Sequence, residues 1–508
     1  RLSNIWMKMA EHILAIDQGT TSTRAIVFDL SATPVGSSQL ELIQYFPQSG
    51  WVEHDPIEIA EATVSVARQA IERAQLRPEN IAAIGITNQR ETTIIWDRDT
   101  GRPVSNAIVW QDRRTAEICS VIRHGEHARD IRQVTGLVVD PYFCATKLMW
   151  LLAQIPNGHR RAVAGELCFG TVDSWLLWRL TDGEIHATDV TNASRTLLLN
   201  IHDLKWDPGM LDIFDIPEPI LPEVRSSTGD FGVTSKSIFG VEIPIAAMAG
   251  DQHAALYGQA CFKKGQVKCT YGTGAFVLAN RGSIPPIQHS GTEDTGLLTT
   301  LGFQVGSKRH YAVEGSVFAT GATVQWLRDG LGIISNATET SDMALMAGSN
   351  GGVYFVPAFV GLGAPHWKPD ATASITGMTR GTSQNHIVRA ALESTAFQVK
   401  DVITTMEGGY KSSDQPLRAD GGQSSNAFVM QFQADILDRP VEVARMPETT
   451  ALGAAFLAGR GIGLWRSNDE INSLWSASAR YEPSMSDSER QNLQAGWLEA
   501  VHRSSATN

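Results

Sequence analysis

The amino-acid sequence predicts an α/β protein built from two large domains. Its 508 residues exceed what one hydrophobic core usually organises. Strand-like apolar runs alternate with segments of helical periodicity, which is typical of α/β layers. A hairpin pattern with a Gly-Thr turn also occurs in each half, as DQGTT at 17–21 and YGTGA at 271–275. We therefore expect domains at 10–258 and 259–508, with the boundary near 255–265.

Strand patterns carry the first half of this prediction. Apolar runs predict strands at 12–17 and 24–30, joined by the short polar connection QGTTST, and a buried strand at 81–86. The following segment, TTIIWD-TG-RPV, predicts a further hairpin.

The helices have recognisable starts. One is expected from Asp55, because Asp55 can cap it, Pro56 suits the first turn and Glu58 completes a capping box. The second half then repeats the alternation of strands and helices. Its expected elements are strand 243–251, hairpin 268–280, helix 386–406, strand 416–420, helix 426–437, the strand VEVARM and the small-residue helix TALGAAFLAG.

Composition excludes several functions. The net charge is −12 and no basic cluster interrupts the chain, so neither nucleic acid nor membrane insertion is expected. The five cysteines are odd in number and form no C-x-x-C pair, which argues against a disulfide framework and a zinc site. Together with the lack of a secretory signal pattern at the N-terminus, this indicates a cytoplasmic protein. P-loop and G-x-G-x-x-G dinucleotide motifs are absent.

The segment DQGTTSTR, from Asp17 to Arg24, is the first candidate binding site. A tight turn containing Gly offers backbone N–H groups to phosphate oxygens, and hydroxyls and an Arg add donors and charge. A carboxylate at a strand end, such as Asp17, can hold Mg²⁺ through water. An ordinary polar hairpin explains this segment equally well when it is taken alone.

Three further segments favour a phosphate site. Gly272-Thr273-Gly274 is a second turn of the same kind, and Asp420-Gly421-Gly422 leaves bare backbone on which a flat base can lie, ahead of Asn426 in the first turn of a helix. In this order the segments resemble the ATP site shared by sugar kinases, actin and heat-shock chaperone ATPases. The resemblance implies two ribonuclease-H-like domains with an active-site cleft between them.

Longer motifs narrow the resemblance to the FGGY carbohydrate kinase family, over nearly the whole chain. GITNQRETTIIWD, AIVWQDRRT, DPYFCATKLMW, FGTVDSWLLWRLT, TNASRT, AGDQHAALYGQ, TYGTGAF, GATVQWLRD, GLGAPHWKPD and ALESTAFQVKDV resemble the members that phosphorylate glycerol with ATP and Mg²⁺. The expected product is sn-glycerol 3-phosphate, and the expected assembly is a homo-oligomer, either a dimer or a tetramer.

The same resemblance assigns roles to individual residues. Asp251 is the general base that takes the proton of the attacking hydroxyl, and Asp17 serves Mg²⁺. The residues implied for glycerol are Arg90, Glu91, Trp110, Tyr142, Asp251, Gln252 and Phe276. The residues implied for the nucleotide are Thr20, Thr21, Ser22, Arg24, Thr273, Gly321, Gln325, Gly422 and Asn426. Orienting a small uncharged polyol does require paired donors and acceptors, and phosphoryl transfer requires positioning and charge neutralisation.

Several assignments have plainer alternatives. Arg90 and Glu91 read alone as an exposed ion pair beside a hairpin, and Trp110 as a core residue. His253 is expected to be structural, because its neighbour Asp251 already fills the role of base.

Two other functions also fit the general pattern. One is the phosphorylation of another polyol or sugar by a xylulokinase-like enzyme, and the other is a nucleotide-driven binding protein without transferase activity. The sequence departs from the family at Ala371-Thr372-Ala373, where Ala-Arg-Gly is usual, so any contact of that Arg is in doubt.

Overall fold

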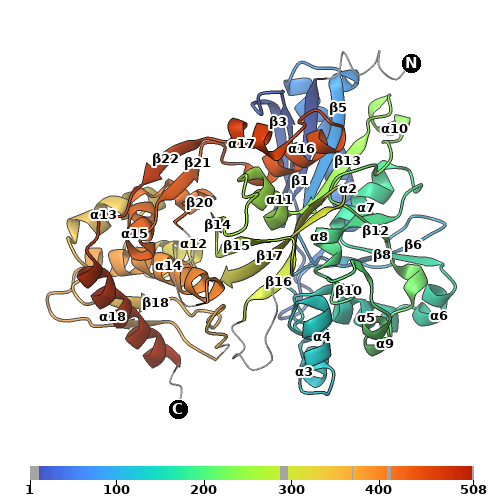
Figure 1. Ribbon diagram of the computed structural model, residues 1–508. Coiled ribbons are helices and arrows are strands. Elements are labelled where there is room, and N and C mark those ends of the chain that lie inside the picture. Colours follow the sequence, from blue (N-terminus) through green and yellow to red (C-terminus); the bar gives the residue numbers. More distant parts are fainter. Residues whose placement is uncertain (1–10, 286–295, 369, 409–413, 506–508) are drawn as a thin grey trace.

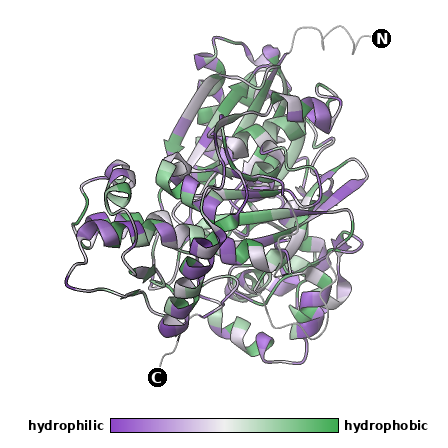
Figure 2. Cartoon of the chain, turned by 60° about the vertical axis from the view of Figure 1, so that its left-hand side comes forward, coloured by the Kyte–Doolittle hydropathy of each residue, from purple (hydrophilic) through white to green (hydrophobic). Residues whose placement is uncertain are grey.

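The computed structural model describes residues 11–285, 296–368, 370–408 and 414–505. Two β-sheets organise this part of the chain and occupy different lobes (Figure 1). The five-stranded sheet has the order β13-β5-β1-β2-β3, and the seven-stranded sheet has the order β16-β17-β15-β14-β20-β21-β22. Hydrophobic residues concentrate on the strands of both sheets and on the helices packed against them (Figure 2). The α/β class predicted from the sequence is confirmed.

The five-stranded sheet belongs to the first half of the chain. Its strands are β1 (His12–Gln18), β2 (Ser22–Phe28), β3 (Pro34–Glu41), β5 (Ile81–Asn88) and β13 (Ile245–Gly250). The hairpin β1–β2 is antiparallel, whereas β1 and β13 both run parallel to β5. The three parallel strands therefore end together at one edge, which is where ligands bind in open α/β sheets.

The helix α2 (Pro56–Arg73) covers this sheet and corrects one prediction. Asp55 caps it as expected, its side chain accepting a hydrogen bond from the backbone N–H of Ile57. The predicted capping box is wrong. Glu58 instead accepts a hydrogen bond from the backbone N–H of Ile43 (3.0 Å), which connects α2 to the loop after β3. The hairpin expected after β5 is also reduced: β6 (Ile94–Asp97) pairs with β8 (Leu167–Gly170), and the return segment contributes only an isolated bridge.

The seven-stranded sheet belongs to the second half. Its strands are β14 (Val267–Tyr271), β15 (Ala275–Gly282), β16 (Leu298–Val305), β17 (Lys308–Val317), β20 (Leu417–Asp420), β21 (Val441–Ala444) and β22 (Ala477–Tyr481). The predicted Gly-Thr-Gly hairpin is β14–β15, and β20 runs parallel to β14.

Helices α14 (Gln384–Met406) and α15 (Ala427–Leu437) pack on the seven-stranded sheet, and α18 (Asp487–Ser505) packs on α15. Trp497 of α18 stacks on Phe397 of α14, with ring centroids 5.1 Å apart, and its indole N–H donates to Asp401. The departure at Ala371 lies beside this packing, since Ala371 is buried and Ser374 hydrogen-bonds to Ser504 of α18.

Shorter elements complete the described chain. The remaining strands are β4 (Glu53–His54), β7 (Ala107–Ile108), β9 (Ala187–Asp189), β10 (Leu199–Asn200), β11 (Lys205–Trp206), β12 (Glu223–Arg225), β18 (Tyr354–Val356) and β19 (Ser374–Thr376). The remaining α-helices are α3 (Ala116–Arg123), α4 (Ala128–Thr135), α5 (Cys144–Gln154), α6 (Gly158–Val163), α7 (Val172–Leu180), α8 (Val190–Ala193), α9 (Pro208–Ile213), α10 (Lys236–Phe239), α11 (Asp251–Gly258), α12 (Gly321–Asp329), α13 (Thr340–Met346), α16 (Thr449–Gly461) and α17 (Asn468–Leu474). No helix in the described ranges is long and apolar enough to cross a bilayer.

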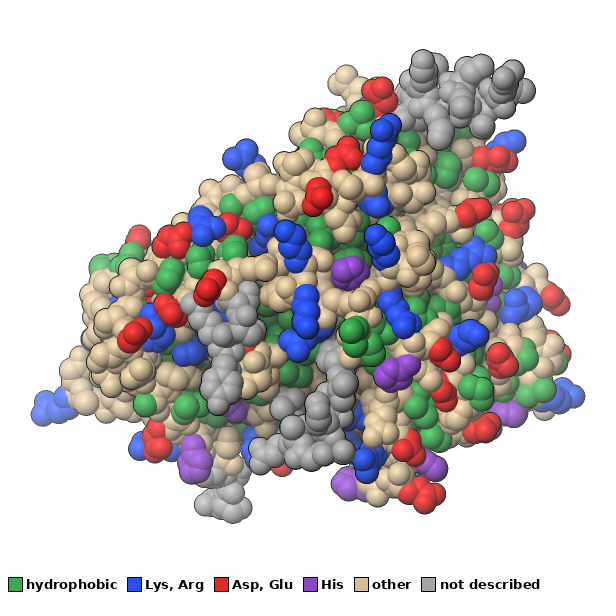
Figure 3. Space-filling view, in the orientation of Figure 1, with side chains coloured by type: hydrophobic (Ala, Val, Ile, Leu, Met, Phe, Trp, Pro, Cys, Tyr) green, Lys and Arg blue, Asp and Glu red, His purple; other side chains and the backbone are tan. Residues whose placement is uncertain are grey.

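Both signs of charge occur on the face shown in Figure 3. Several Lys and Arg side chains gather near the middle of that face, and most Asp and Glu side chains lie toward its edges.

The small-residue helix α16 returns from the second half to the five-stranded sheet. It packs on β1, β5 and β13 and on α11, as Figure 1 also shows. Backbones approach closely here: a Cβ added at Gly453 would lie 1.8 Å from the carbonyl oxygen of Ala254, and one at Gly85 would lie 2.2 Å from that of Ala454. Only glycine permits this approach. The domain boundary at 258/259 stays a prediction. Helix α16 comes after this boundary in the sequence, but its side chains pack in one hydrophobic core with those of the first sheet.

We predict that Gly453→Ala destabilises the protein. An isolated Gly→Ala change inside a helix is stabilising, but overpacking against a fixed carbonyl costs about 1–3 kcal/mol. The matched control is Gly381→Ala, where the added Cβ meets only the side-chain oxygen of Thr379 at 3.7 Å. Differential scanning calorimetry should show a lower melting temperature for G453A and little change for G381A. Equal melting temperatures for the two variants would contradict the close packing of α16.

Candidate active site

The ends of the parallel strands carry the first site residues. Arg90 and Glu91 follow β5, and Asp251 follows β13 and begins α11. The Nε of Arg90 lies 3.0 Å from Oδ1 of Asp251. Gly250 leaves room for this pair, because a Cβ there would lie 2.7 Å from Cγ of Arg90.

Arg90 and Glu91 are both buried, which excludes the alternative of an exposed ion pair. They also pair with other residues rather than with each other. Arg90 donates from Nη1 to Oε2 of Glu314 (2.5 Å) and from Nη2 to Oε1 (3.3 Å). Arg195 donates from Nε to Oε1 of Glu91 (2.5 Å) and from Nη2 to Oε1 of Glu314 (3.2 Å). These four buried residues form a charge cluster with two positive and two negative side chains.

Within the charge cluster, Arg90 and Glu314 stabilise each other's charged forms. Burial disfavours the Glu314 carboxylate, but Arg195 and Arg90 outweigh that cost and hold the pKa of Glu314 well below its usual range. Burial also disfavours the charged form of Arg90, yet the nearby carboxylates, with Glu314 first, raise its pKa well above the ordinary value. Arg90 and Glu314 therefore favour each other's charged forms, whereas burial raises the pKa of Glu91 against the opposing effect of Arg195.

The backbone of Glu91 is fixed as well. Its φ is +60°, an uncommon left-handed conformation for a residue with a side chain. The buried Lys147 donates from Nζ to the carbonyl oxygens of Glu91 (2.8 Å) and Tyr142 (3.0 Å), and Cys144 also donates to Glu91. Such strain persists only where the surroundings enforce it.

Aromatic rings border the charge cluster. Tyr142 lies edge-to-face with Trp110, with centroids 5.7 Å apart, and the Arg195 guanidinium lies 5.6 Å from the Tyr142 ring. The indole N–H of Trp110 donates to Oγ1 of Thr20 (2.9 Å), which ties this ring to the first Gly-Thr turn. Trp110 is half-buried rather than fully buried.

The seven-stranded sheet contributes Phe276 and Glu314 to the candidate site. Opposite residues in antiparallel strands share a face, so the pairings Thr270↔Phe276↔Ser316 and Leu278↔Glu314 put Phe276 on the same face as Glu314.

Gln252, beside Asp251, also meets the seven-stranded sheet. It accepts a hydrogen bond from the buried Lys268, which donates to Thr270 as well. His253 is fully buried and burial lowers its pKa well below the ordinary value, which agrees with a structural role.

The two Gly-Thr turns are built differently. In the second turn, the carbonyls of Gly272 and Thr273 accept from the N–H groups of Gly321 and Ala322, at the start of α12. Gly321 is needed there, because a Cβ would lie 2.5 Å from the Gly272 oxygen. In the first turn, Arg24 forms an ion pair with Glu448, just before α16.

The two glycines of the Gly421-Gly422 segment differ: packing requires a glycine at Gly421, whereas Gly422 has open space beside it. Gly421 has φ +87°, and a Cβ there would lie 2.5 Å from the carbonyl oxygen of Tyr271. A Cβ at Gly422 would meet nothing within 4 Å. Asn426 caps α15 by accepting from the N–H of Val429, so the helix begins one residue later than expected.

Asp17 suits a divalent cation. Burial, and then the charge of Asp251, raise the pKa of Asp17 to about 7. A cation beside Asp17 would favour its charged form. No group of three or more His, Cys, Asp or Glu side chains gathers anywhere in the described ranges, but Mg²⁺ bound with a nucleotide needs only one or two carboxylates.

Four other predicted residues form no polar side-chain contact with this set in the described ranges. Within the described part of the chain, no side-chain hydrogen bond or ion pair joins Thr21, Ser22, Gln325 or Asn426 to the other predicted residues. Thr273 and Gly422 are exposed.

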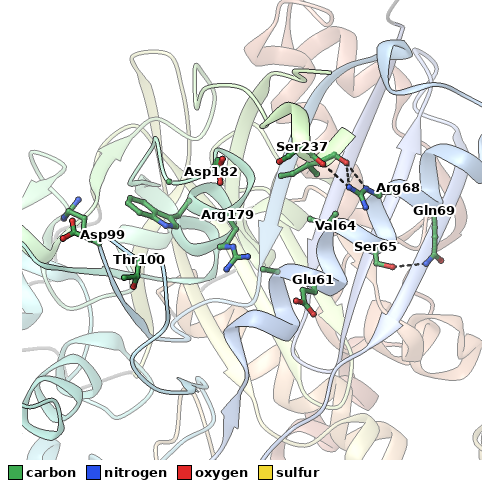
Figure 4. Close-up of a pocket in the computed structure, with 16 residues that line it drawn as sticks. Glu61, Val64, Ser65, Arg68, Gln69, Asp99, Thr100, Arg179, Asp182 and Ser237 are labelled. Carbon is green, nitrogen blue, oxygen red and sulfur yellow. Dashed lines mark hydrogen bonds between the residues drawn. The ribbon is translucent and has the colours of Figure 1, made fainter. Parts of the chain in front are cut away.

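A groove of about 970 Å³ lies elsewhere, between α2, the turn at 98–101, the end of α7 and α10. It contains none of the predicted residues. Arg68 points from α2 toward α10 and donates to the carbonyl oxygens of Ser237 and Ile238 (Figure 4). The site is therefore marked by buried charge rather than by the size of a groove.

Three residues of the site were missed by the sequence reasoning. Arg195 and Lys147 lie inside the motifs TNASRT and DPYFCATKLMW, but received no role. Glu314 lies outside every motif. Its one signal is a lone carboxylate within the apolar strand YAVEGSV.

Two α/β lobes, each with a Gly-Thr turn, and a buried charge cluster at the ends of parallel strands agree with the sugar kinase class. Residues 12–258 match the N-terminal domain, and residues 267–462 the C-terminal domain, of the FGGY family of carbohydrate kinases. The chain belongs to this family.

Individual relatives narrow the class further. Glycerol kinase 2 of Thermotoga maritima is 54% identical over 494 residues, covering 97% of this chain and 99% of the relative. Glycerol kinase of Limosilactobacillus reuteri is 50% identical over 499 residues, covering 97% and 98%. The crystal structure of Plasmodium falciparum glycerol kinase with ADP matches with a TM-score of 0.91 and 39% identity, covering 98% of both chains. Gluconate kinase of Lactobacillus acidophilus, at 24% identity and a TM-score of 0.85, shares the fold.

Proposed function

We propose that this protein is a glycerol kinase, which transfers the terminal phosphoryl group of ATP to glycerol and forms sn-glycerol 3-phosphate, as the first step of glycerol catabolism. The observation that carries the proposal is that the neighbouring side chains of Arg90 and Glu91 are buried and held in place, with Arg90 in contact with Asp251. The identity of about 50–54% to glycerol kinases over nearly the whole chain supports it.

Arg90 and Glu91 have the capacity to bind adjacent hydroxyls. Each terminal nitrogen of Arg90 uses one N–H group on Glu314 and keeps a second. Glu91 receives Arg195 on Oε1, and Oε2 has no hydrogen-bond partner among the described residues. One hydroxyl can therefore accept from Arg90 while its neighbour donates to Glu91. Tyr142 and Gln252 would complete the polar contacts, and Trp110 and Phe276 would cover the carbon atoms.

Asp251 is proposed as the general base. Its Oδ1 accepts from the backbone N–H of Gln252 (2.6 Å) and faces Arg90, whereas Oδ2 has no hydrogen-bond partner in the described part of the chain. Oδ2 would take the proton of the attacking hydroxyl while that oxygen bonds to the γ-phosphorus and ADP leaves. Arg90 would keep the carboxylate aimed.

The nucleotide is proposed to bind at the two Gly-Thr turns and the open backbone at Gly422. The proposed contacts are Thr20, Thr21, Ser22, Arg24, Thr273, Gly321, Gln325, Gly422 and Asn426. Asp17 would hold Mg²⁺ through water. When bound, Mg²⁺ neutralises charge on the phosphates. A homo-oligomer is proposed on the family resemblance alone, and a cytoplasmic location is proposed on the cysteine pattern, which favours a reducing compartment.

A coupled ADP-release assay over polyols and sugars tests the function. We predict turnover with glycerol and roughly 10⁴-fold lower kcat/KM with propane-1,2-diol, because a missing hydroxyl leaves a buried charge unpaired. Xylulose as the preferred substrate would favour the xylulokinase-like alternative, and ATP binding without any turnover would favour a nucleotide-driven binding protein.

We predict that Asp251→Asn lowers kcat by about 10²–10⁴-fold while glycerol binding changes less. The substitution keeps the oxygen that accepts from Gln252 but removes the base. The control is Asp215→Asn, an exposed carboxylate outside the site, which should leave kcat unchanged. Steady-state kinetics measures both, and near-normal turnover of D251N would remove Asp251 from this role.

A further inference from the structure

Glu314 is an unusual residue for its position. It lies in β17 between two neighbouring strands, opposite Leu278 on one side and Leu298 on the other, and its side chain is fully buried. A carboxylate is retained in such surroundings only when it is paired and hydrogen-bonded. Its partners, Arg90 and Arg195, both come from the first half of the chain.

The geometry of these contacts fixes more than an ion pair would. The carboxylate of Glu314 receives both terminal nitrogens of Arg90, so the guanidinium plane is set by two bonds. Oε1 of Glu314 also accepts a hydrogen bond from Nη2 of Arg195. The Nε of the same Arg195 donates to Oε1 of Glu91. One carboxylate thus determines the orientation of Arg90 directly and of Glu91 through Arg195.

Neither Glu314 nor Arg195 is available to a ligand, because the side chains of both have no exposed surface. Their effect on a substrate must therefore pass through the residues that they hold. Without Glu314, the two buried cations would repel each other, and each would keep a single carboxylate partner, Asp251 for Arg90 and Glu91 for Arg195.

We propose that Glu314 is a positioning residue of the glycerol site, acting with Arg195 to hold Arg90 and Glu91 in the geometry that recognises adjacent hydroxyls. The inference rests on the proposed function. It means that a buried side chain from the second half of the chain orients the residues of the first half that bind glycerol. The strand that carries Glu314 also leads toward Gly321, at the start of α12.

The test is Glu314→Gln, which keeps the shape and removes the charge. We expect kcat/KM for glycerol to fall about 10²–10³-fold, since breaking a buried pair leaves uncompensated charge. The preference for glycerol over propane-1,2-diol should narrow by a similar factor, because selectivity depends on the geometry of Arg90 and Glu91. The KM for ATP should change less than about twofold.

Glu393→Gln is the matched control. Glu393 is equally buried and pairs with Arg389 (2.7 Å) on α14, outside the site. The Glu393→Gln substitution should lower the melting temperature and leave the preference for glycerol over propane-1,2-diol unchanged. If E314Q behaves like E393Q, with lost stability but the same preference, Glu314 has a merely structural role and the inference is overturned.

Two milder variants keep the test valid if E314Q fails to fold. Glu314→Asp keeps the charge but shortens its reach, and Arg195→Lys keeps the charge but loses the two-pronged contact. Each should raise the KM for glycerol about tenfold and narrow the same preference. An unchanged preference in both variants would overturn the inference. A wild-type protein that phosphorylates no glycerol would instead overturn the proposed function, and this inference with it.

Discussion

Two guanidinium groups, those of Arg90 and Arg195, are buried at the junction of the two lobes, and the carboxylate of Glu314 bonds to both. Charges in such surroundings carry a large desolvation cost, and only good geometry with several hydrogen bonds offsets it. The surrounding protein meets this condition by supplying carboxylates from both halves of the chain. Such a cluster is weak evidence for stability, but it gives a small polyol a rigid set of donors and acceptors.

The fold explains how these side chains meet. Parallel strands β5 and β13 end at one edge and present Arg90, Glu91 and Asp251, while β17 brings Glu314 from the second sheet. Gly250 leaves the space that Arg90 fills. Helix α16 returns to the first sheet through glycine contacts, so a helix from the second half of the chain packs on the sheet of the first half.

Sequence reasoning reached the elements because their signals are local. The β1–β2 and β14–β15 hairpins and the cap of α2 depend on neighbouring residues, and the structure confirms them. Glu58 was assigned wrongly because its partner, Ile43, lies in a loop that no local pattern identifies. Arg90, Glu91 and Asp251 came from family motifs, and their closeness required the parallel register. Glu314 could not be placed, since its partners are more than a hundred positions away in the chain.

A crystal structure with glycerol and a non-hydrolysable ATP analogue tests the central claim most directly. The account predicts glycerol hydroxyls within about 3.2 Å of Arg90 and Glu91. It also predicts a terminal hydroxyl facing Oδ2 of Asp251, with both terminal nitrogens of Arg90 still on Glu314. Glycerol bound away from this pair, or an Arg90 that leaves Glu314 to reach it, would contradict the account.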